Sequence, residues 1–341
     1  MTFAEAKRQI ESAHQSSDLF GADGKVVYRK LASAVHPDHV APSKKTVAAH
    51  LFAKLAKLWD QHNGKSTSDY FTISTKRHSY VVTEENYRDS IANAYDCVWN
   101  NEDGNEERGW MRMPRSPRDS DLMMAEATAL QSIHNSDHAH PAFFPMLIES
   151  FRHRDRGTRV ERRGNVVAIF DGPDPQWVPL TRVQAAYPDG VDGRDAAWMW
   201  RRLLVAVGDA HSAGVVHGAI LPQHVLIHPE KHGLILVNWC YSVGLKQPLK
   251  AIVTGDTWAY PPEARAKESL TEASDVYMVA KIMQAILRGR APKPMRAFIR
   301  GCTLQSESMR PHDASALREE FDDLLERLYG PRKFRPFTVP N

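Results

Sequence analysis

A change of residue pattern near residue 64 divides the chain into two parts. Residues 1–64 place hydrophobic side chains at helical spacing, whereas runs typical of strands, such as residues 165–170 and 234–238, occur only afterwards. The first part holds nine Lys or Arg against six Asp or Glu, and the rest of the chain holds 35 of each. We predict a small all-α domain at residues 1–64, joined through the polar segment 63–68 to a larger domain at residues 65–330.

Composition excludes several classes of protein. Hydrophobic residues make up 42% and charged residues 25% of the chain, which is typical of folded globular proteins and not of disordered, collagen-like or coiled-coil chains. The net charge of +3 is too small to indicate a nucleic-acid partner. We find no apolar run long enough to span a membrane and no secretory signal pattern in the first 30 residues, so we expect a soluble, cytoplasmic protein.

Cysteine and histidine spacing does not predict a metal site. The three cysteines are odd in number and widely scattered, so we expect reduced, buried thiols at Cys97, Cys240 and Cys302. Three histidines fall in one polar stretch without a cysteine or an HExxH pattern, and we interpret that stretch as a solvated loop: His134, His138 and His140.

Three helices are predicted in the first part, at residues 3–13, 23–35 and 44–62. The second must end at Pro37, because proline lacks an amide donor and disfavours helical geometry in the residue before it. Leu51, Leu55 and Leu58 form an apolar side on the third helix, which should pack antiparallel on the second. The expected result is a helical hairpin with His36, Pro37 and Asp38 at its tip.

This hairpin resembles a J domain, the module through which co-chaperones engage DnaK-type chaperones and stimulate their ATP hydrolysis. Residues 28–32 lead into His-Pro-Asp in a pattern close to that of the family, although the loop after the first helix is longer and residues 18–21 have no family counterpart. A basic helix face also steers association towards an acidic partner. The resemblance implies a chaperone-binding surface formed by Lys25, Arg29, Lys30, His36, Pro37 and Asp38; the alternative is an ordinary hairpin with a chance tripeptide.

From about residue 80 the chain resembles the protein-kinase fold, which implies an α+β domain with a mostly β small lobe and a mostly α large lobe. The helix expected at residues 198–213 runs into residues 214–227, which have the layout of the kinase catalytic loop and the following strand. Further segments match in order and spacing: residues 110–114, 238–240, 255–263, 274–277 and 310–311.

The chemical positions of the kinase pattern are not retained. Phosphoryl transfer needs an aspartate to orient the hydroxyl nucleophile, an asparagine and an aspartate to bind magnesium, and a lysine for the phosphates. The corresponding positions hold Ala219, His224, Asn238 and Arg112. Arg112 and Glu126, on the expected third strand and helix C of the small lobe, are remnants of a nucleotide site that we interpret as an internal ion pair. We expect no magnesium site.

The expected glycine-rich loop is also altered. Residues 87–95 contain no glycine, and Asp89 among them would repel a triphosphate. These features argue against ATP as a cofactor. We also interpret His217, in the catalytic-loop region, as a packed structural histidine rather than a general base.

Positions that hold a kinase fold together do remain. Glu263 can pair with Arg310, and Asp275 can anchor the backbone of the catalytic loop. Retained structural positions beside missing catalytic ones indicate a pseudokinase. We therefore predict an adaptor, in which a J domain recruits a DnaK-type chaperone and an inactive kinase-like domain binds an unidentified client or partner.

Two alternatives stay open at this point. The first is an atypical ATP-dependent protein kinase or nucleotidyl transferase that uses Arg112, Asp256 or Asn238 in altered roles. The second is a pseudokinase regulator that senses a nucleotide without turnover. The basic tail at residues 331–341 is interpreted as a solvated terminus, and nucleic-acid binding through it is given little weight.

Overall fold

The computed structural model of the protein describes residues 1–13, 16–21, 23–41, 44–63, 71–88, 91–137, 140–154, 159–169 and 176–340. The chain forms two compact units, one of Met1–Ser116 with Phe151–Val167 and one of Pro117–Ser150 with Ala168–Asn341. No helix within the described ranges is long and apolar enough to cross a membrane. The predicted linker at residues 63–68 lies almost entirely outside these ranges.

The three helices predicted in the first part are present: α1 (Phe3–Ser12), α2 (Gly24–Val35) and α3 (Lys45–His62). Thr2 and Glu5 form a capping box that satisfies two free amides at the start of α1. Ile10, Leu31 and Leu55, one from each helix, are fully buried in a common core. This core stabilises the hairpin that carries the His-Pro-Asp tip.

The long loop between α1 and α2 contributes to the same core. Phe20, in the segment without a family counterpart, is only 3% exposed. Its ring meets Trp59 of α3 edge to face, with 5.1 Å between ring centroids. The unusual loop is therefore a packing element of the helical part.

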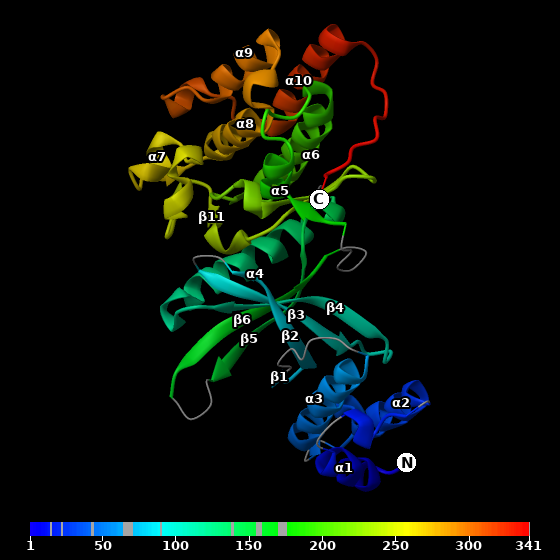
Figure 1. Ribbon diagram of the computed structural model, residues 1–341. Coiled ribbons are helices and arrows are strands. Elements are labelled where there is room, and N and C mark those ends of the chain that lie inside the picture. Colours follow the sequence, from blue (N-terminus) through cyan, green and yellow to red (C-terminus); the bar gives the residue numbers. More distant parts are fainter. Residues whose placement is uncertain are drawn as a thin grey trace. The chain divides into compact units, whose positions relative to one another are not determined.

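A six-stranded sheet completes the first unit's architecture, in the order β1-β2-β3-β4-β6-β5 (Figure 1). Each described strand pair in it is antiparallel, and the register of β3 and β4 is continuous from Ala92↔Pro114 to Asn100↔Glu106. Tyr80, Trp99 and Phe151 form an aromatic cluster on one face. The strand bounds are β1 (Phe71–Ser74), β2 (Ser79–Arg88), β3 (Ala92–Asn100), β4 (Glu106–Pro114), β5 (Met146–Arg154) and β6 (Glu161–Ala168).

The second unit is mostly helical. Its helices are α4 (Ser120–His134), α5 (Leu180–Ala186), α6 (Gly193–Ser212), α7 (Pro262–Arg265), α8 (Glu272–Leu287), α9 (Lys293–Cys302) and α10 (Ala314–Tyr329). Its short strands are β7 (Val178–Pro179), β8 (Val215–Val216), β9 (Val225–His228), β10 (Gly233–Leu236), β11 (Val243–Gly244), β12 (Gln247–Pro248) and β13 (Ser269–Leu270). Trp200 of α6 packs against Phe298 and Phe321, which joins α6 to α9 and α10.

Helix α6 begins five residues before the predicted start at Trp198. The Asp192 side chain accepts a hydrogen bond from the Arg194 backbone N–H and caps the helix at that earlier position.

The solvated loop predicted for three histidines was wrong at His134. This residue is the last of α4, and its Nε2 lies 2.9 Å from the Pro145 carbonyl oxygen. His140 contacts Asp209, and His138 lies outside the described residues.

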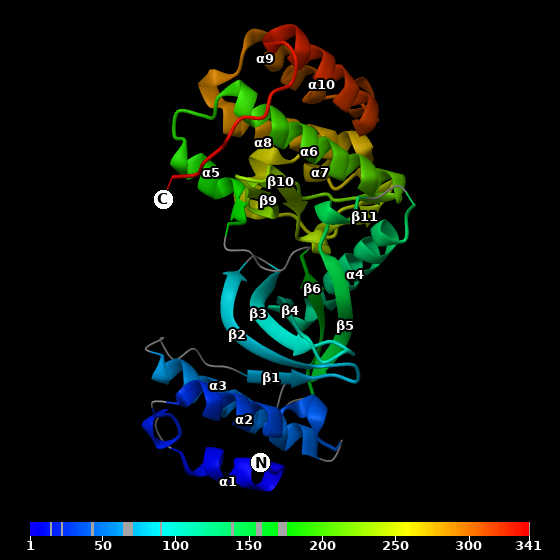
Figure 2. The same cartoon turned by 90° about the vertical axis from the view of Figure 1, so that its right-hand side faces the viewer.

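Residues 331–336 of the C-terminal segment are exposed, as predicted for the basic run, but the segment is packed at Phe337. Phe337 is 4% exposed and stacks on Tyr187 with 5.6 Å between centroids, and the Tyr187 hydroxyl donates to the Thr338 carbonyl oxygen at 2.7 Å. The segment runs from the end of α10 past α6 towards α5 (Figure 2). The prediction considered only the charges of the tail, whereas the apolar ring of Phe337 holds its far end on the second unit.

All three cysteines are buried and free, as predicted. Burial raises the pKa of the Cys302 thiol to about 12 and raises that of Cys97 further, and nearby carboxylates add to both shifts. Cys97 and Cys302 are therefore protonated at neutral pH.

Candidate functional site

Asp275 at the start of α8 organises the loop that would be catalytic in a kinase. Its carboxylate accepts hydrogen bonds from the backbone N–H groups of His217 (2.8 Å) and Gly218 (3.0 Å), and it lies 3.0 Å from Nε2 of His211. Gly218 has φ of 71°, a backbone conformation that favours glycine. A buried carboxylate with several donors fixes the path of this loop.

Both ring nitrogens of His217 are used within the protein. Nδ1 accepts from the Ala219 backbone N–H (3.2 Å) and Nε2 lies 2.9 Å from the Val237 carbonyl oxygen, so Nε2 carries the proton of a neutral ring. Burial lowers the pKa of His217, although the Asp275 charge and the Val237 carbonyl act in the opposite direction. With no free nitrogen, His217 has the geometry of a structural residue.

The three positions assigned to the catalytic base and the metal ligands are all buried: Ala219, His224 and Asn238. Ala219 offers only a methyl group. Nδ1 of His224 lies 2.8 Å from the Ala219 carbonyl oxygen, and the ring stacks on Tyr241. Asn238 has the left-handed backbone conformation, with φ of 66°. None of the three supplies the carboxylate that magnesium prefers.

Asp256 is the carboxylate that the sequence offered for altered chemistry, and both of its oxygens accept hydrogen bonds within the protein. Oδ2 accepts from the Gln223 side-chain amide at 2.7 Å, and Oδ1 accepts from the Trp258 indole N–H at 3.2 Å. These bonds tie the segment of residues 254–259 to the loop before β9. Within the described ranges, no group of three or more His, Cys, Asp or Glu side chains is arranged to hold a metal ion.

Glu263 and Arg310 form a bidentate ion pair in the second unit. Arg310 donates to both carboxylate oxygens, at 2.7 and 2.9 Å, and also to the carbonyl oxygens of Leu304 and Gln305. Ser274 donates to the same carboxylate at 2.8 Å. Burial alone would raise the pKa of Glu263, but the donors Arg310 and Ser274 outweigh it and lower the pKa below 4.5.

Arg112 and Glu126 are each buried, on β4 of the first unit and on α4 of the second. β4 is the fourth strand in chain order. If β1 is left out of the count, β4 takes the place of the third strand on which the kinase resemblance puts Arg112. The ion pair between the two residues stays a prediction. In place of a glycine-rich loop, β2 ends at Arg88 and β3 begins at Ala92, and Asp89 lies outside the described residues.

The His-Pro-Asp turn follows α2 as a single 3-10 turn, Pro37–His39. The His36 ring caps this turn, because its Nδ1 accepts from the Asp38 backbone N–H at 3.2 Å. Pro37 is buried, and the Asp38 side chain is 28% exposed with its Oδ2 3.9 Å from Nδ1 of His36. On the preceding helix, Lys25, Arg29 and Lys30 are all exposed. The tip therefore presents a carboxylate beside a basic helix face.

His36 itself is partly covered by the sheet of the same unit. Its Nε2 lies 2.9 Å from the side-chain amide nitrogen of Asn100, the last residue of β3, and its ring meets Phe52 of α3 edge to face. Burial lowers the pKa of His36, with His39 adding to the effect and the Asp38 and Glu106 charges opposing it. Sequence reasoning missed Asn100, because a polar residue at the end of a strand carries no signal of a distant partner.

Comparison with known proteins supports the kinase-like part. No family model matches the chain. The serine/threonine-protein kinase PknH of Mycobacterium bovis and that of Mycobacterium tuberculosis are each 29% identical to it over 133 residues, 37% of this chain. The aligned region is 22% and 21% of those proteins, so the chain matches only about a fifth of their length.

Among solved structures, the BubR1 kinase domain is similar over 75% of this chain and 83% of its own, with a TM-score of 0.54 and 14% identity. The chain therefore has a protein-kinase-like α+β fold. None of these matches concerns a J domain, so the assignment of residues 1–64 stays a prediction.

Proposed function

We propose that the protein is a co-chaperone adaptor, in which the helical hairpin recruits a DnaK-type chaperone and the kinase-like part is an inactive pseudokinase that binds a client or partner. The observation that carries this proposal is the surface of the hairpin. Asp38 is exposed at the tip, and the basic side chains of α2 are exposed beside it. A complementary acidic patch on a chaperone would be attracted by long-range charge and positioned by the rigid turn.

The occupants of the catalytic positions support the pseudokinase half of the proposal. Ala219 cannot accept a proton, and the buried His224 and Asn238 bring no anionic oxygen for magnesium. The parts that hold the fold, Asp275 and the Glu263–Arg310 pair, have full sets of hydrogen bonds. An atypical kinase is supported less well, because the remaining candidate Asp256 is bound to Gln223 and Trp258.

The contact between His36 and Asn100 bears on how such an adaptor would be controlled. A chaperone that needs the imidazole of the tip must displace the Asn100 amide, so the sheet lowers the fraction of molecules that are ready to bind. The carboxylate of Asp38 stays accessible in either state. We expect partial rather than complete masking.

The direct test is single-turnover ATP hydrolysis by a DnaK-type chaperone with and without the full chain. Asp38→Asn keeps the shape of the side chain and removes its charge, and it should abolish stimulation. Asp23→Asn is the matched control, because Asp23 is an exposed carboxylate before α2 that makes no side-chain capping bond. Equal stimulation by both variants would refute the chaperone role.

The pseudokinase half has a separate test. The chain is incubated with ATP labelled on the γ-phosphate, in magnesium or manganese, and incorporation into itself and a generic substrate protein is measured. We expect none. Incorporation that disappears in Asp256→Asn would instead favour an atypical kinase.

A further inference from the structure

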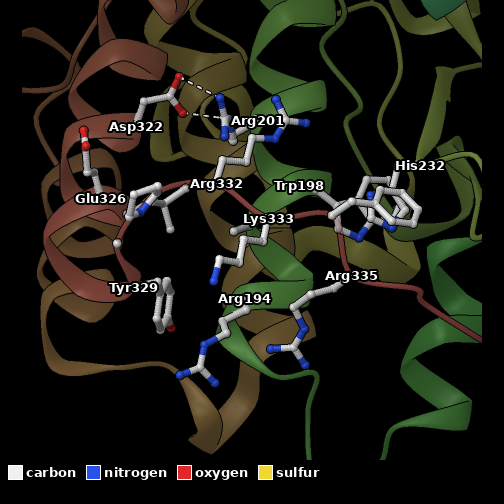
Figure 3. A pocket seen from close by; sticks show the side chains of 15 residues that line it. Arg194, Trp198, Arg201, His232, Asp322, Glu326, Tyr329, Arg332, Lys333 and Arg335 are labelled. Atoms are coloured by element: carbon white, nitrogen blue, oxygen red, sulfur yellow. Dashed lines mark hydrogen bonds and ion pairs between the residues drawn. The ribbon is translucent and has the colours of Figure 1, made fainter.

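The second unit contains a cavity of about 850 Å³ that the proposed function does not use. It lies between α6, α10 and the C-terminal segment 330–335, and Figure 3 shows its side chains gathered around one space. Five of the lining side chains are basic and two are acidic: Arg194, Arg201, Arg332, Lys333 and Arg335 against Asp322 and Glu326. The cavity walls therefore carry an excess of positive charge.

Two of the five basic side chains are already neutralised. Nε of Arg201 lies 2.7 Å from Oδ1 of Asp322, and Nε of Arg335 lies 3.1 Å from Oδ1 of Asp195. The Arg194 guanidinium lies over the Tyr329 ring, 4.9 Å from its centroid. That contact does not neutralise the charge of Arg194.

Arg332 and Lys333, both on the C-terminal segment, are exposed, and neither has an ion pair among the described residues. Burial lowers the pKa of Arg201 and of Arg202, and the charge of Arg332 lowers both further. Several like charges thus lie close together, and the acidic side chains around them leave Arg332 and Lys333 without an ion pair among the described residues. Such clusters are costly unless an anion compensates them.

One wall of the cavity is formed by two stacked aromatic rings. Trp198 and His232 are 6% and 7% exposed, and their rings stack face to face with 4.3 Å between centroids. Within the described residues, neither Nε1 of Trp198 nor Nε2 of His232 has a hydrogen-bond partner. These two nitrogens are themselves covered, so the stacked rings give the cavity a flat aromatic wall and supply no polar contact to a ligand.

We propose that this cavity binds a small molecule that carries two or more clustered phosphate groups. Guanidinium and ammonium groups converge from α6 and from the C-terminal segment, and arginine matches phosphate oxygens with paired hydrogen bonds. The volume is within the range of small-molecule sites, and is much larger than a single phosphate requires. The exposed ring of Phe334 borders the site and can cover an apolar part of such a ligand.

The proposal gives the basic tail a role. Phe337 and the Tyr187–Thr338 bond hold the far end of the segment on the second unit, so Arg332 and Lys333 are presented to α6. A ligand that bridges them to Arg194 would fasten the segment further. The site is independent of the adaptor function and of the kinase-like catalytic loop.

The test is isothermal titration of the full chain with inorganic tripolyphosphate and, separately, with ATP, each against sodium sulfate at equal ionic strength. We expect saturable binding of one tripolyphosphate per chain. The double variant Arg332→Ala/Lys333→Ala should weaken it at least tenfold, because two charge-assisted contacts are lost. Both side chains are exposed, so the fold is retained, and an unchanged melting temperature without ligand checks this.

The matched control is Lys293→Ala/Arg300→Ala, which removes the same charge from exposed positions of α9 and should change the affinity less than twofold. Arg194→Gln tests the opposite wall and should weaken binding on its own. If ATP also binds and the double variant Arg332→Ala/Lys333→Ala weakens its binding equally, the ligands of this site include nucleotides. If only tripolyphosphate shows this dependence, the ligands do not include nucleotides. No binding of tripolyphosphate at millimolar concentration, or equal weakening in both double variants, would overturn the proposal.

Discussion

Replacing Arg310 by methionine tests whether the retained ion pair holds the kinase-like fold. Methionine has a similar length, but it leaves Glu263 with only the Ser274 hydroxyl as a side-chain donor. Removing one partner of a buried ion pair costs about 3 to 5 kcal/mol, because the other charge stays buried and unpaired. The carbonyl oxygens of Leu304 and Gln305 also lose their donor, so we expect the upper part of that range.

Such a loss is large enough to measure by thermal unfolding. For a unit of about 200 residues, each kcal/mol shifts the melting temperature by about 2 to 4 °C, which predicts a fall of about 10 to 20 °C for Arg310→Met. Arg300→Met on α9 is the control, because its side chain is exposed, and it should shift the melting temperature by less than about 2 °C. The double variant Glu263→Gln/Arg310→Met should be more stable than the sum of its single variants predicts, because neither charge is left unpaired.

The pH dependence has a definite sign. Because the pKa of Glu263 is lowered in the folded protein, the pair stabilises fully above the ordinary value of 4.5 and is lost as the pH falls through the folded-state value. Arg310→Met should therefore remove part of the acid-induced loss of stability. A fall in melting temperature below 3 °C at neutral pH, or strict additivity in the double variant, would refute this reasoning.

Two further predictions concern the helical part. In Asn100→Ala, NMR titration should find the pKa of His36 closer to 6.5 than in the wild type, because less of its ring is buried. Because the pKa of His36 is lowered in the closed state, that state is fully stabilised above pH 6.5 and loses stability as the pH falls below 6.5. Acidification should therefore also open the contact in the wild type. An unchanged pKa would show that Asn100 does not cover His36. Phe20→Ala should lower the free energy of unfolding by about 3 to 5 kcal/mol in denaturant titration, whereas Val26→Ala, at an exposed site, should change it by less than about 0.5 kcal/mol. Equal effects of the two would mean that Phe20 is not part of the core.

Local rules were enough to predict the helical part. Pro37 ends α2, and the leucines of α3 lie on its buried side, so the hairpin follows from backbone restriction and hydrophobic spacing. The kinase-like fold was predictable because several segments must stand in a fixed order. Asp275 and Glu263 are such positions, and their partners lie far away in the sequence but at fixed places in the fold.

Contacts that depend on tertiary position could not be predicted. Nothing near Asn100 in the sequence indicates that it meets His36, 64 residues earlier. The packing of Phe337 was missed for a related reason: the charges of the tail are visible in sequence, but the site for Phe337 exists only once α5 and α6 are folded. The cavity beside Trp198 and His232 likewise forms from segments that are more than 100 residues apart at their extremes.

The central claim is that the His-Pro-Asp tip engages a DnaK-type chaperone while the sheet restrains it. One experiment addresses both parts: the single-turnover ATP hydrolysis rate of the chaperone, measured with the wild type, Asn100→Ala and Asp38→Asn at equal concentration. We predict the greatest stimulation with Asn100→Ala, because the residue that covers the His36 ring is removed, and none with Asp38→Asn. Identical rates for all three proteins would contradict the account.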